Sequence, residues 1–140
     1  MDLAGRRIYI DANVLIYFLD GRSRLSDAAT AALEGAAAQE WEAITSDLVL
    51  AEVLVGAYRS PEADAVRVTE ALFAQPWLTL LPLSRRDFEA AAALRARRGD
   101  ALVDALHLGT AANSGCDALL TNDRRLNAVA GVDVLALATG

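Results

Sequence analysis

The most conspicuous absence in this chain of 140 residues is lysine, since all 13 of its positive side chains are arginine. A P-loop, whose Gly-x-x-x-x-Gly-Lys motif needs a lysine to hold nucleotide phosphates, is therefore excluded. The Gly-x-Gly-x-x-Gly fingerprint of a dinucleotide site is absent as well. Neither of these two glycine-rich phosphate loops explains what the chain binds.

Cysteine and long apolar runs are also scarce. The single cysteine, Cys116, excludes an internal disulfide and fits a reducing cytoplasm, where we expect it to be a small buried side chain. No apolar run approaches the roughly 18 residues that a membrane helix needs. Asp11 interrupts the apolar stretch after Arg6 and Arg7, so we expect neither a signal peptide nor a membrane span. These features predict a cytoplasmic protein.

Acidic residues outnumber basic ones by 19 to 13, which gives a net charge of −6. Nucleic-acid-binding proteins usually carry a basic excess, and this chain does not. The acidity is compatible with a cluster of metal-binding carboxylates or with a basic protein partner. Hydrophobic residues make up 54% of the chain, which argues against disorder, and its length predicts one domain over residues 1–140.

Expected strands and helices alternate along the chain. Runs of β-branched and aromatic residues predict strands at 6–10, 42–45, 77–81, 117–121 and 132–135. Apolar periodicity and capping residues predict helices at 14–19, 25–39, 48–58, 61–75, 85–98, 101–113 and 124–129. We expect Asn13 to cap the first helix, Pro61 to open the fourth and Asp100 to cap the sixth. Strands separated by helices indicate an α/β sandwich with a parallel sheet covered on both faces.

Two acids, Asp11 and Asp123, lie at or just after the ends of expected strands. The carboxyl ends of parallel strands share one edge of an open sheet, and ligands bind at that edge. Taken alone, Asp11 is about equally compatible with an ordinary turn residue between a strand and a helix. Both acids are candidates for a site at this edge.

Glu52 lies within an apolar helix, because its neighbours three and four residues away are Leu48, Val49, Val55 and Gly56. A carboxylate buried on such a face is costly unless it is paired. The alternative is a slightly rotated helix that leaves Glu52 at the edge of the core. We favour a functional role for Glu52, since solvated helix glutamates usually have polar neighbours.

Asp104 repeats this pattern in the segment Ala-Leu-Val-Asp-Ala-Leu-His-Leu, which is otherwise apolar apart from His107. We expect Asp100 to be a helix cap and His107 to be a packed core residue bonded to backbone, although His107 could be a metal ligand. The four remaining acids, Asp11, Glu52, Asp104 and Asp123, are typical of a hard-cation site. Oxygen ligands of this kind suit Mg²⁺ or Mn²⁺ better than zinc.

Four segments together resemble the PIN-domain nucleases, and most nearly the VapC-like toxins of type II toxin–antitoxin pairs. They are Tyr-Ile-Asp11-Ala-Asn13, Ser46-Asp-Leu-Val-Leu-Ala-Glu52, Val-Asp104-Ala-Leu-His-Leu and Thr121-Asn-Asp123. Their order and separations cover nearly the whole chain. The resemblance implies a three-layer α/β sandwich with about five parallel strands in its central sheet. It also implies a Mg²⁺- or Mn²⁺-dependent endoribonuclease whose products carry a 5′-phosphate and a 3′-hydroxyl.

The family's acidic quartet maps onto Asp11, Glu52, Asp104 and Asp123. The resemblance assigns metal ligation chiefly to the three aspartates, while Glu52 either binds metal or orients the attacking water. Asn13 and Thr121 match positions that help to orient the first acid and the metal ligands. The implied partners are RNA, a cognate antitoxin protein and a second copy of the chain. Five arginines either hold the RNA backbone or lie on solvated helix surface, namely Arg95, Arg97, Arg98, Arg124 and Arg125.

Three alternatives compete with this interpretation. A receiver domain also uses strand-end acids, but this chain resembles it less because that family requires a lysine. A PIN-like module that only binds RNA or protein, and an RNA-processing nuclease outside a toxin pair, stay open. The intact quartet favours an enzyme, because a pure scaffold gains nothing from carboxylates that repel one another.

Overall fold

The computed structural model describes residues 2–137 and contains five strands and six helices within them. The strands are β1 (Arg7–Ile10), β2 (Glu42–Ser46), β3 (Leu78–Leu81), β4 (Ala118–Leu120) and β5 (Asp133–Leu135). The helices are α1 (Ala12–Asp20), α2 (Arg24–Ala37), α3 (Asp47–Arg59), α4 (Ala65–Phe73), α5 (Arg85–Arg98) and α6 (Leu102–Asn113). None of the helices in this range is long and apolar enough to cross a membrane.

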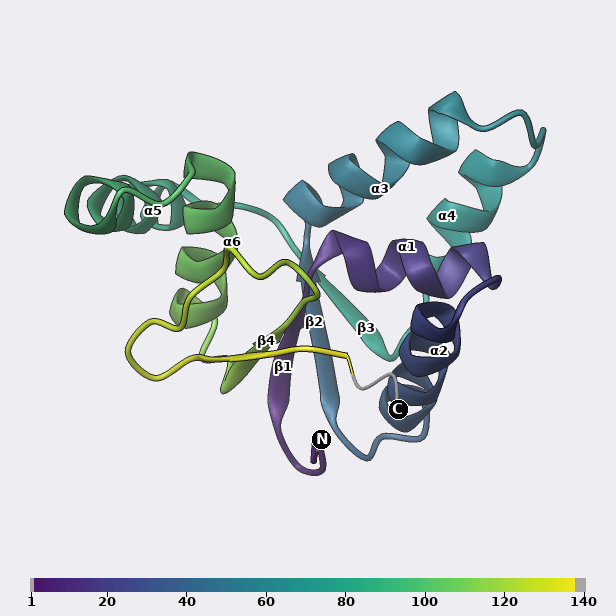
Figure 1. Cartoon of the computed structure of the whole chain (residues 1–140), viewed down its shortest axis with the longest axis horizontal. Coiled ribbons are helices and arrows are strands. Elements are labelled where there is room, and N and C mark those ends of the chain that lie inside the picture. Colours follow the sequence, from purple (N-terminus) through teal and green to yellow (C-terminus); the bar gives the residue numbers. More distant parts are fainter. Residues whose placement is uncertain (1, 138–140) are drawn as a thin grey trace.

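The strands form one sheet in the order β3-β2-β1-β4-β5, and every neighbouring pair is parallel. Figure 1 shows α1 to α4 on one side of this sheet and α5 and α6 on the other. The expected three-layer α/β sandwich with five parallel strands is therefore confirmed. Helices cover both faces of the sheet, which is why the buried residues of β1 and β4 are apolar without alternation.

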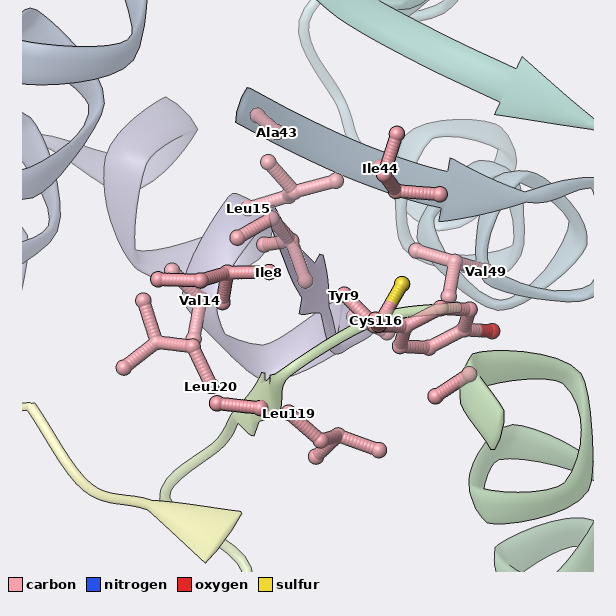
Figure 2. Packing of buried hydrophobic residues seen from close by; sticks show 14 of the residues in the cluster. Ile8, Tyr9, Val14, Leu15, Ala43, Ile44, Val49, Cys116, Leu119 and Leu120 are labelled. Carbon is pink, nitrogen blue, oxygen red and sulfur yellow. The ribbon is translucent and has the colours of Figure 1, made fainter. Parts of the chain in front are cut away.

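The core centres on β1, whose residues Ile8, Tyr9 and Ile10 are fully buried. Successive side chains of a strand point to opposite faces, so Tyr9 faces away from Ile8 and Ile10. In Figure 2 the Tyr9 ring points away from Val14 and Leu15 of α1. This orientation directs the Tyr9 hydroxyl toward α6, on the other side of the sheet.

The strand order reverses beside β1. The chain builds β1, β2 and β3 outward in one direction and then returns to add β4 on the opposite side of β1. Such a reversal opens a crevice at the carboxyl ends of the two strands, where ligands of α/β proteins bind. The backbone N–H of Asp11 donates to the carbonyl of Leu120 at 3.0 Å, so the first residue after β1 lies against the end of β4.

Several predicted helix ends are wrong. Asp11, not Asn13, caps α1, because its side chain accepts the N–H of Ala12. The helix expected from Pro61 begins only at Ala65, since a turn in which Ala65 N–H donates to the Glu62 carbonyl at 3.2 Å comes first.

Asp100 does not cap α6, which begins at Leu102 after Ala101 at its N-cap. The Asp100 carboxylate instead accepts a hydrogen bond from Nη2 of Arg98 at 2.6 Å.

The helix expected at 124–129 is also wrong, because these residues form a turn and an irregular segment. The guanidinium of Arg98 in α5 donates hydrogen bonds to the backbone carbonyls of Asn127 and Ala128 at 3.1 and 2.7 Å. These two hydrogen bonds hold the irregular segment against α5. Cys116, by contrast, is buried as expected, and burial raises the pKa of its thiol to about 11.

Candidate metal centre

Asp11 is a buried carboxylate with three hydrogen-bond donors around it. Its Oδ2 accepts the Thr121 hydroxyl at 2.7 Å and Nδ2 of Asn13 at 3.2 Å, and its Oδ1 accepts the N–H of Ala12 at 2.8 Å. The positive end of the α1 dipole also favours a negative charge at this position. These contacts fix the orientation of Asp11 at the crevice between β1 and β4.

Asn13 and Thr121 link the segments that follow β1 and β4. Asn13 Nδ2 donates to the Thr121 hydroxyl at 3.0 Å, and its Oδ1 accepts the N–H of Asn122 at 3.0 Å. The Thr121 hydroxyl also accepts the N–H of Asp123 at 3.0 Å. The two residues that the resemblance assigned to a supporting role therefore lie against Asp11 and the backbone of Asp123.

Glu52 and His107 lie beside Asp11. His107 Nε2 is 2.6 Å from Oε1 of Glu52 and 3.7 Å from Oδ1 of Asp11. One ligand-type atom from each of the three residues falls within 4.8 Å of the others, the single such group within residues 2–137. The Glu52 side chain is 37% exposed, so it is both paired and at the edge of the core.

The expectation that His107 is bonded to backbone is wrong, because both of its ring nitrogens contact side chains. Nδ1 lies 2.8 Å from the Tyr9 hydroxyl, which lies 2.7 Å from Oγ of Ser46. His107 is still a core residue, since only 2% of it is exposed. This arrangement was not predicted, and its signal in the sequence is a lone histidine one turn after Asp104 in an apolar helix.

Asp104 and Asp123 stand outside the 4.8 Å group, but Asp104 interacts electrostatically with Asp11 and His107 of that group. Burial is the main cause that raises the pKa of Asp104, and the charges of Asp123 and Asp11 raise it further. Arg125 and His107 oppose this increase. The structure therefore brings Asp11 and Glu52 into close proximity, and sets Asp104 within range of the charges of Asp11 and Asp123.

Asp123 is paired with Arg125, one of the five candidate RNA-binding arginines. The hydrogen bonds from Arg125 hold the pKa of Asp123 below its usual range. Arg98 is engaged with Asp100 and two backbone carbonyls, and Arg95 donates to the Asp100 carbonyl at 2.9 Å. Arg97 and Arg124 are exposed.

The donor set fits a hard divalent cation. Carboxylate oxygens are the ligands that Mg²⁺ and Mn²⁺ prefer, and the carboxylates of Asp11 and Glu52 lie close together at this edge of the sheet. Burial is the main reason for the raised pKa of Asp104, and the negative charges of Asp123 and Asp11 add to it. A bound cation would favour the ionised form of this carboxylate.

A family model of the PIN domain matches residues 8–132. No curated protein matches the chain. The fold is similar to that of a toxin–antitoxin complex from Klebsiella pneumoniae, with 26% identity, 89% of this chain and 94% of that chain covered, and a TM-score of 0.71.

Two further solved structures share the fold. VapBC2 from Rickettsia felis, bound to a DNA fragment from its promoter, is 18% identical over 94% of this chain and 98% of that one, with a TM-score of 0.75. VapC20 from Mycobacterium tuberculosis, a sarcin–ricin loop cleaving toxin, is 16% identical over 80% and 86% of the two chains, with a TM-score of 0.66. The VapC-like PIN fold expected from the four sequence segments is confirmed, and the chain belongs to the PIN-domain family.

Proposed function

We propose that this chain is a single-domain, Mg²⁺- or Mn²⁺-dependent endoribonuclease and the toxin of a toxin–antitoxin pair. The observation that carries the proposal is the approach of the Asp11 and Glu52 carboxylates at the switch point of a PIN fold, with Asp104 and Asp123 close by. Two structural relatives support the toxin assignment, one a toxin–antitoxin complex and the other a toxin that cleaves the sarcin–ricin loop.

Each acid has a role in this proposal. Asp11, Asp104 and Asp123 would hold the cation, which when bound neutralises phosphate charge and makes water more acidic. Glu52, at the exposed rim, would bind the cation or accept the proton of the water that attacks phosphorus. The water oxygen bonds to phosphorus and the 3′-oxygen leaves with a proton, which yields a 5′-phosphate and a 3′-hydroxyl.

The RNA backbone requires positive groups near this rim. Arg97 and Arg124 are exposed, and a guanidinium fork fits a phosphate. Arg125 would also be available whenever a cation takes its place beside Asp123. The overall charge of −6 means that the cation and these arginines supply most of the attraction for RNA.

An antitoxin segment is the partner that we propose for a cleft between α1, α3 and α4. The cleft has a volume of about 480 Å³ and is lined by Ile16, Val53 and Val68 among others. Ile16 and Val68 are 43% and 41% exposed, and Tyr58 nearby on α3 is 70% exposed. Apolar side chains exposed together mark an interaction surface.

We also propose a homodimer in the cytoplasm, which light scattering at micromolar concentration would test.

Cleavage of bulk RNA with Mg²⁺ or with EDTA tests the enzymatic proposal. We expect cleavage only with Mg²⁺, and a loss of about 100-fold or more in Asp104→Asn, whose side chain keeps its volume but loses its charge. Asp64→Asn removes the same charge at the N-cap of α4, outside the quartet, and should cleave as the wild type does.

Two results would favour the alternatives. RNA binding without cleavage under either condition would indicate a PIN-like binding module. Cleavage by a protein whose gene has no neighbouring reading frame for a small DNA-binding protein would indicate an RNA-processing nuclease.

A further inference from the structure

A chain of hydrogen bonds runs from the start of α3 to the candidate metal centre. The N–H of Val49 donates to Oγ of Ser46 at 3.4 Å, and that oxygen lies 2.7 Å from the Tyr9 hydroxyl. The Tyr9 hydroxyl lies 2.8 Å from Nδ1 of His107, whose Nε2 lies 2.6 Å from Oε1 of Glu52. Ser46, Tyr9 and His107 are all almost fully buried, so they have little contact with solvent.

The protons in this chain have one consistent direction. An ionised Glu52 carboxylate only accepts, so Nε2 of His107 must donate to it. Nδ1 is then free to accept, and the Tyr9 hydroxyl is a suitable donor because burial keeps the pKa of Tyr9 far above its usual value. Ser46 already accepts from Val49, and its own proton can go to the Tyr9 oxygen. Every group is satisfied when all protons point toward Glu52.

We infer that His107 is a positioning residue for the Glu52 carboxylate, and that Tyr9 and Ser46 fix its tautomer. The inference rests on the proposed function, which places Glu52 in the metal centre. The Nε2 nitrogen also lies 3.7 Å from Oδ1 of Asp11, so this nitrogen is close to two carboxylates that repel each other. His107 thereby keeps the half-exposed Glu52 side chain turned toward Asp11 when no cation is bound.

A purely structural role would look different. A buried histidine is satisfied by any donor and acceptor, and backbone groups would serve as well. Here both ring nitrogens contact side chains, and one of those side chains is an acid of the candidate site. Hydrogen-bond partners behind metal ligands hold the ligands in place, and their loss typically lowers metal affinity about 10- to 100-fold.

Nitrogen NMR of the imidazole tests the geometry directly. His107 is the single histidine of the chain, so full-length protein prepared without a histidine tag gives one set of ring signals. We expect a protonated Nε2 in the metal-free wild type, and we expect its signal to shift when Mg²⁺ is added. A ring whose Nε2 carries no proton would overturn the inference, because that nitrogen could not hold Glu52.

Mn²⁺ affinity, measured by calorimetry, tests the consequence. Tyr9→Phe removes only the hydroxyl behind His107 and should weaken Mn²⁺ binding about 10-fold or more, as should His107→Leu. His107→Gln carries an amide N–H that can reach Glu52, so it should recover much of the affinity that leucine loses. Thr110→Val is the matched control, because Thr110 is buried one turn further along α6 and its hydroxyl has no hydrogen-bond partner among residues 2–137.

The outcomes separate this inference from the proposed function. If the wild type binds Mn²⁺ and both Tyr9→Phe and His107→Leu bind it with the same affinity, the positioning role is overturned but the metal centre is not. A wild type that binds no Mn²⁺ would overturn both. An equal loss in Thr110→Val would also overturn the positioning role, since disturbed packing of α6 would then explain the effect. Cooperative thermal melts establish that each variant is folded.

Discussion

The guanidinium of Arg125 spans both carboxylate oxygens of Asp123. Its Nε lies 3.0 Å from Oδ1 and its Nη2 lies 2.7 Å from Oδ2, while the backbone N–H of Arg125 donates to Oδ1 at 2.9 Å. The positive charge of Arg125 also acts on Asp104 and Asp11. Under the proposed function, a metal ion entering this centre meets an acid that already has a cationic partner.

We therefore expect Arg125→Gln to bind Mn²⁺ more tightly than the wild type. The Arg125 side chain is 76% exposed, and such ion pairs are weak, so the gain should be about two- to fivefold. Arg124→Gln makes the same change of net charge one residue away without touching Asp123 and is the control. Calorimetric titration of both variants measures the effect, and an equal gain in the two would trace it to net charge alone.

The second prediction concerns thermal stability with metal. A ligand that binds only the native state adds RT ln(1 + [L]/Kd), which is about 2.7 kcal/mol at a hundredfold excess over Kd and several degrees in melting temperature. We expect millimolar Mn²⁺ to raise the melting temperature of the wild type by several degrees relative to EDTA. In Asp104→Asn the shift should be much smaller. An equal shift in both proteins would remove Asp104 from the cation site.

Asp104→Asn is a sharper choice for that melt than Asp11→Asn. Asp11 accepts three hydrogen bonds, and an amide nitrogen in place of one oxygen would face a donor. A loss of stability in Asp11→Asn would therefore mix the missing charge with a broken network. Asp104 carries a raised pKa, so removal of its charge relieves a cost in the metal-free protein.

The pH dependence of that cost is the third prediction. A raised pKa means that the native state binds the Asp104 proton more tightly than the unfolded chain does. The penalty is then fully present above the raised pKa and fades as pH falls toward about 3.9, the unfolded value. In EDTA, Asp104→Asn should be more stable than the wild type at pH 7, and the difference should narrow toward pH 4. Urea unfolding at several pH values measures it, and a constant difference would contradict the assignment.

The pKa values of Asp123 and Asp100 are shifted in the opposite direction from that of Asp104. Hydrogen bonds from Arg125 and Arg98 lower the pKa of each carboxyl. Their contribution to stability is present above about 3.9 and is lost as pH falls through the lowered values. Wild type and Asp104→Asn should therefore both lose stability below about pH 4, which separates this acid transition from the effect of Asp104.

The fourth prediction is that Arg98 is a structural residue. Its guanidinium donates to Asp100 and to the carbonyls of Asn127 and Ala128, which joins the end of α5 to the segment before β5. Arg98→Ala should lower the free energy of unfolding by about 2 kcal/mol, the usual size for hydrogen bonds with a charged group. Arg98→Lys should recover little, because an ammonium lacks the planar fork. Arg97→Ala, at an exposed neighbour, should unfold at nearly the wild-type urea concentration.

Much of the fold could be predicted because each strand and most helices carry local signals. The runs around β1 and β4 are short, apolar and followed by acids, and parallel strands place those acids at one edge. The cap of α6 and the segment 124–129 could not be predicted in the same way. Arg98 pairs with Asp100, the expected cap, and it also holds two carbonyls of the later segment from 29 and 30 residues away along the chain.

The candidate site, too, could be predicted only in part. Asp11 and Asp123 were predicted from the ends of strands, Glu52 and Asp104 from apolar helices, and the four together from the family resemblance. The structure brings Asp11 and Glu52 together, and the charges of Asp11 and Asp123 act on Asp104. The partners of His107 were not found, because Tyr9 lies 98 residues earlier and reads as an ordinary strand residue. Only the alternation of β1 in three dimensions reveals that the Tyr9 hydroxyl faces α6.

The place of β4 beside the central strand bears on synthesis by the ribosome. Until residues 118–120 emerge, one edge of β1 lacks the neighbour with which it pairs in the finished sheet. Thr121 and Asp123 also arrive at this late stage, so Asp11 has neither the hydroxyl that orients it nor its companion acid. A growing chain therefore cannot assemble the crevice before residues 118–123 have emerged, and whatever the crevice does begins only after that point.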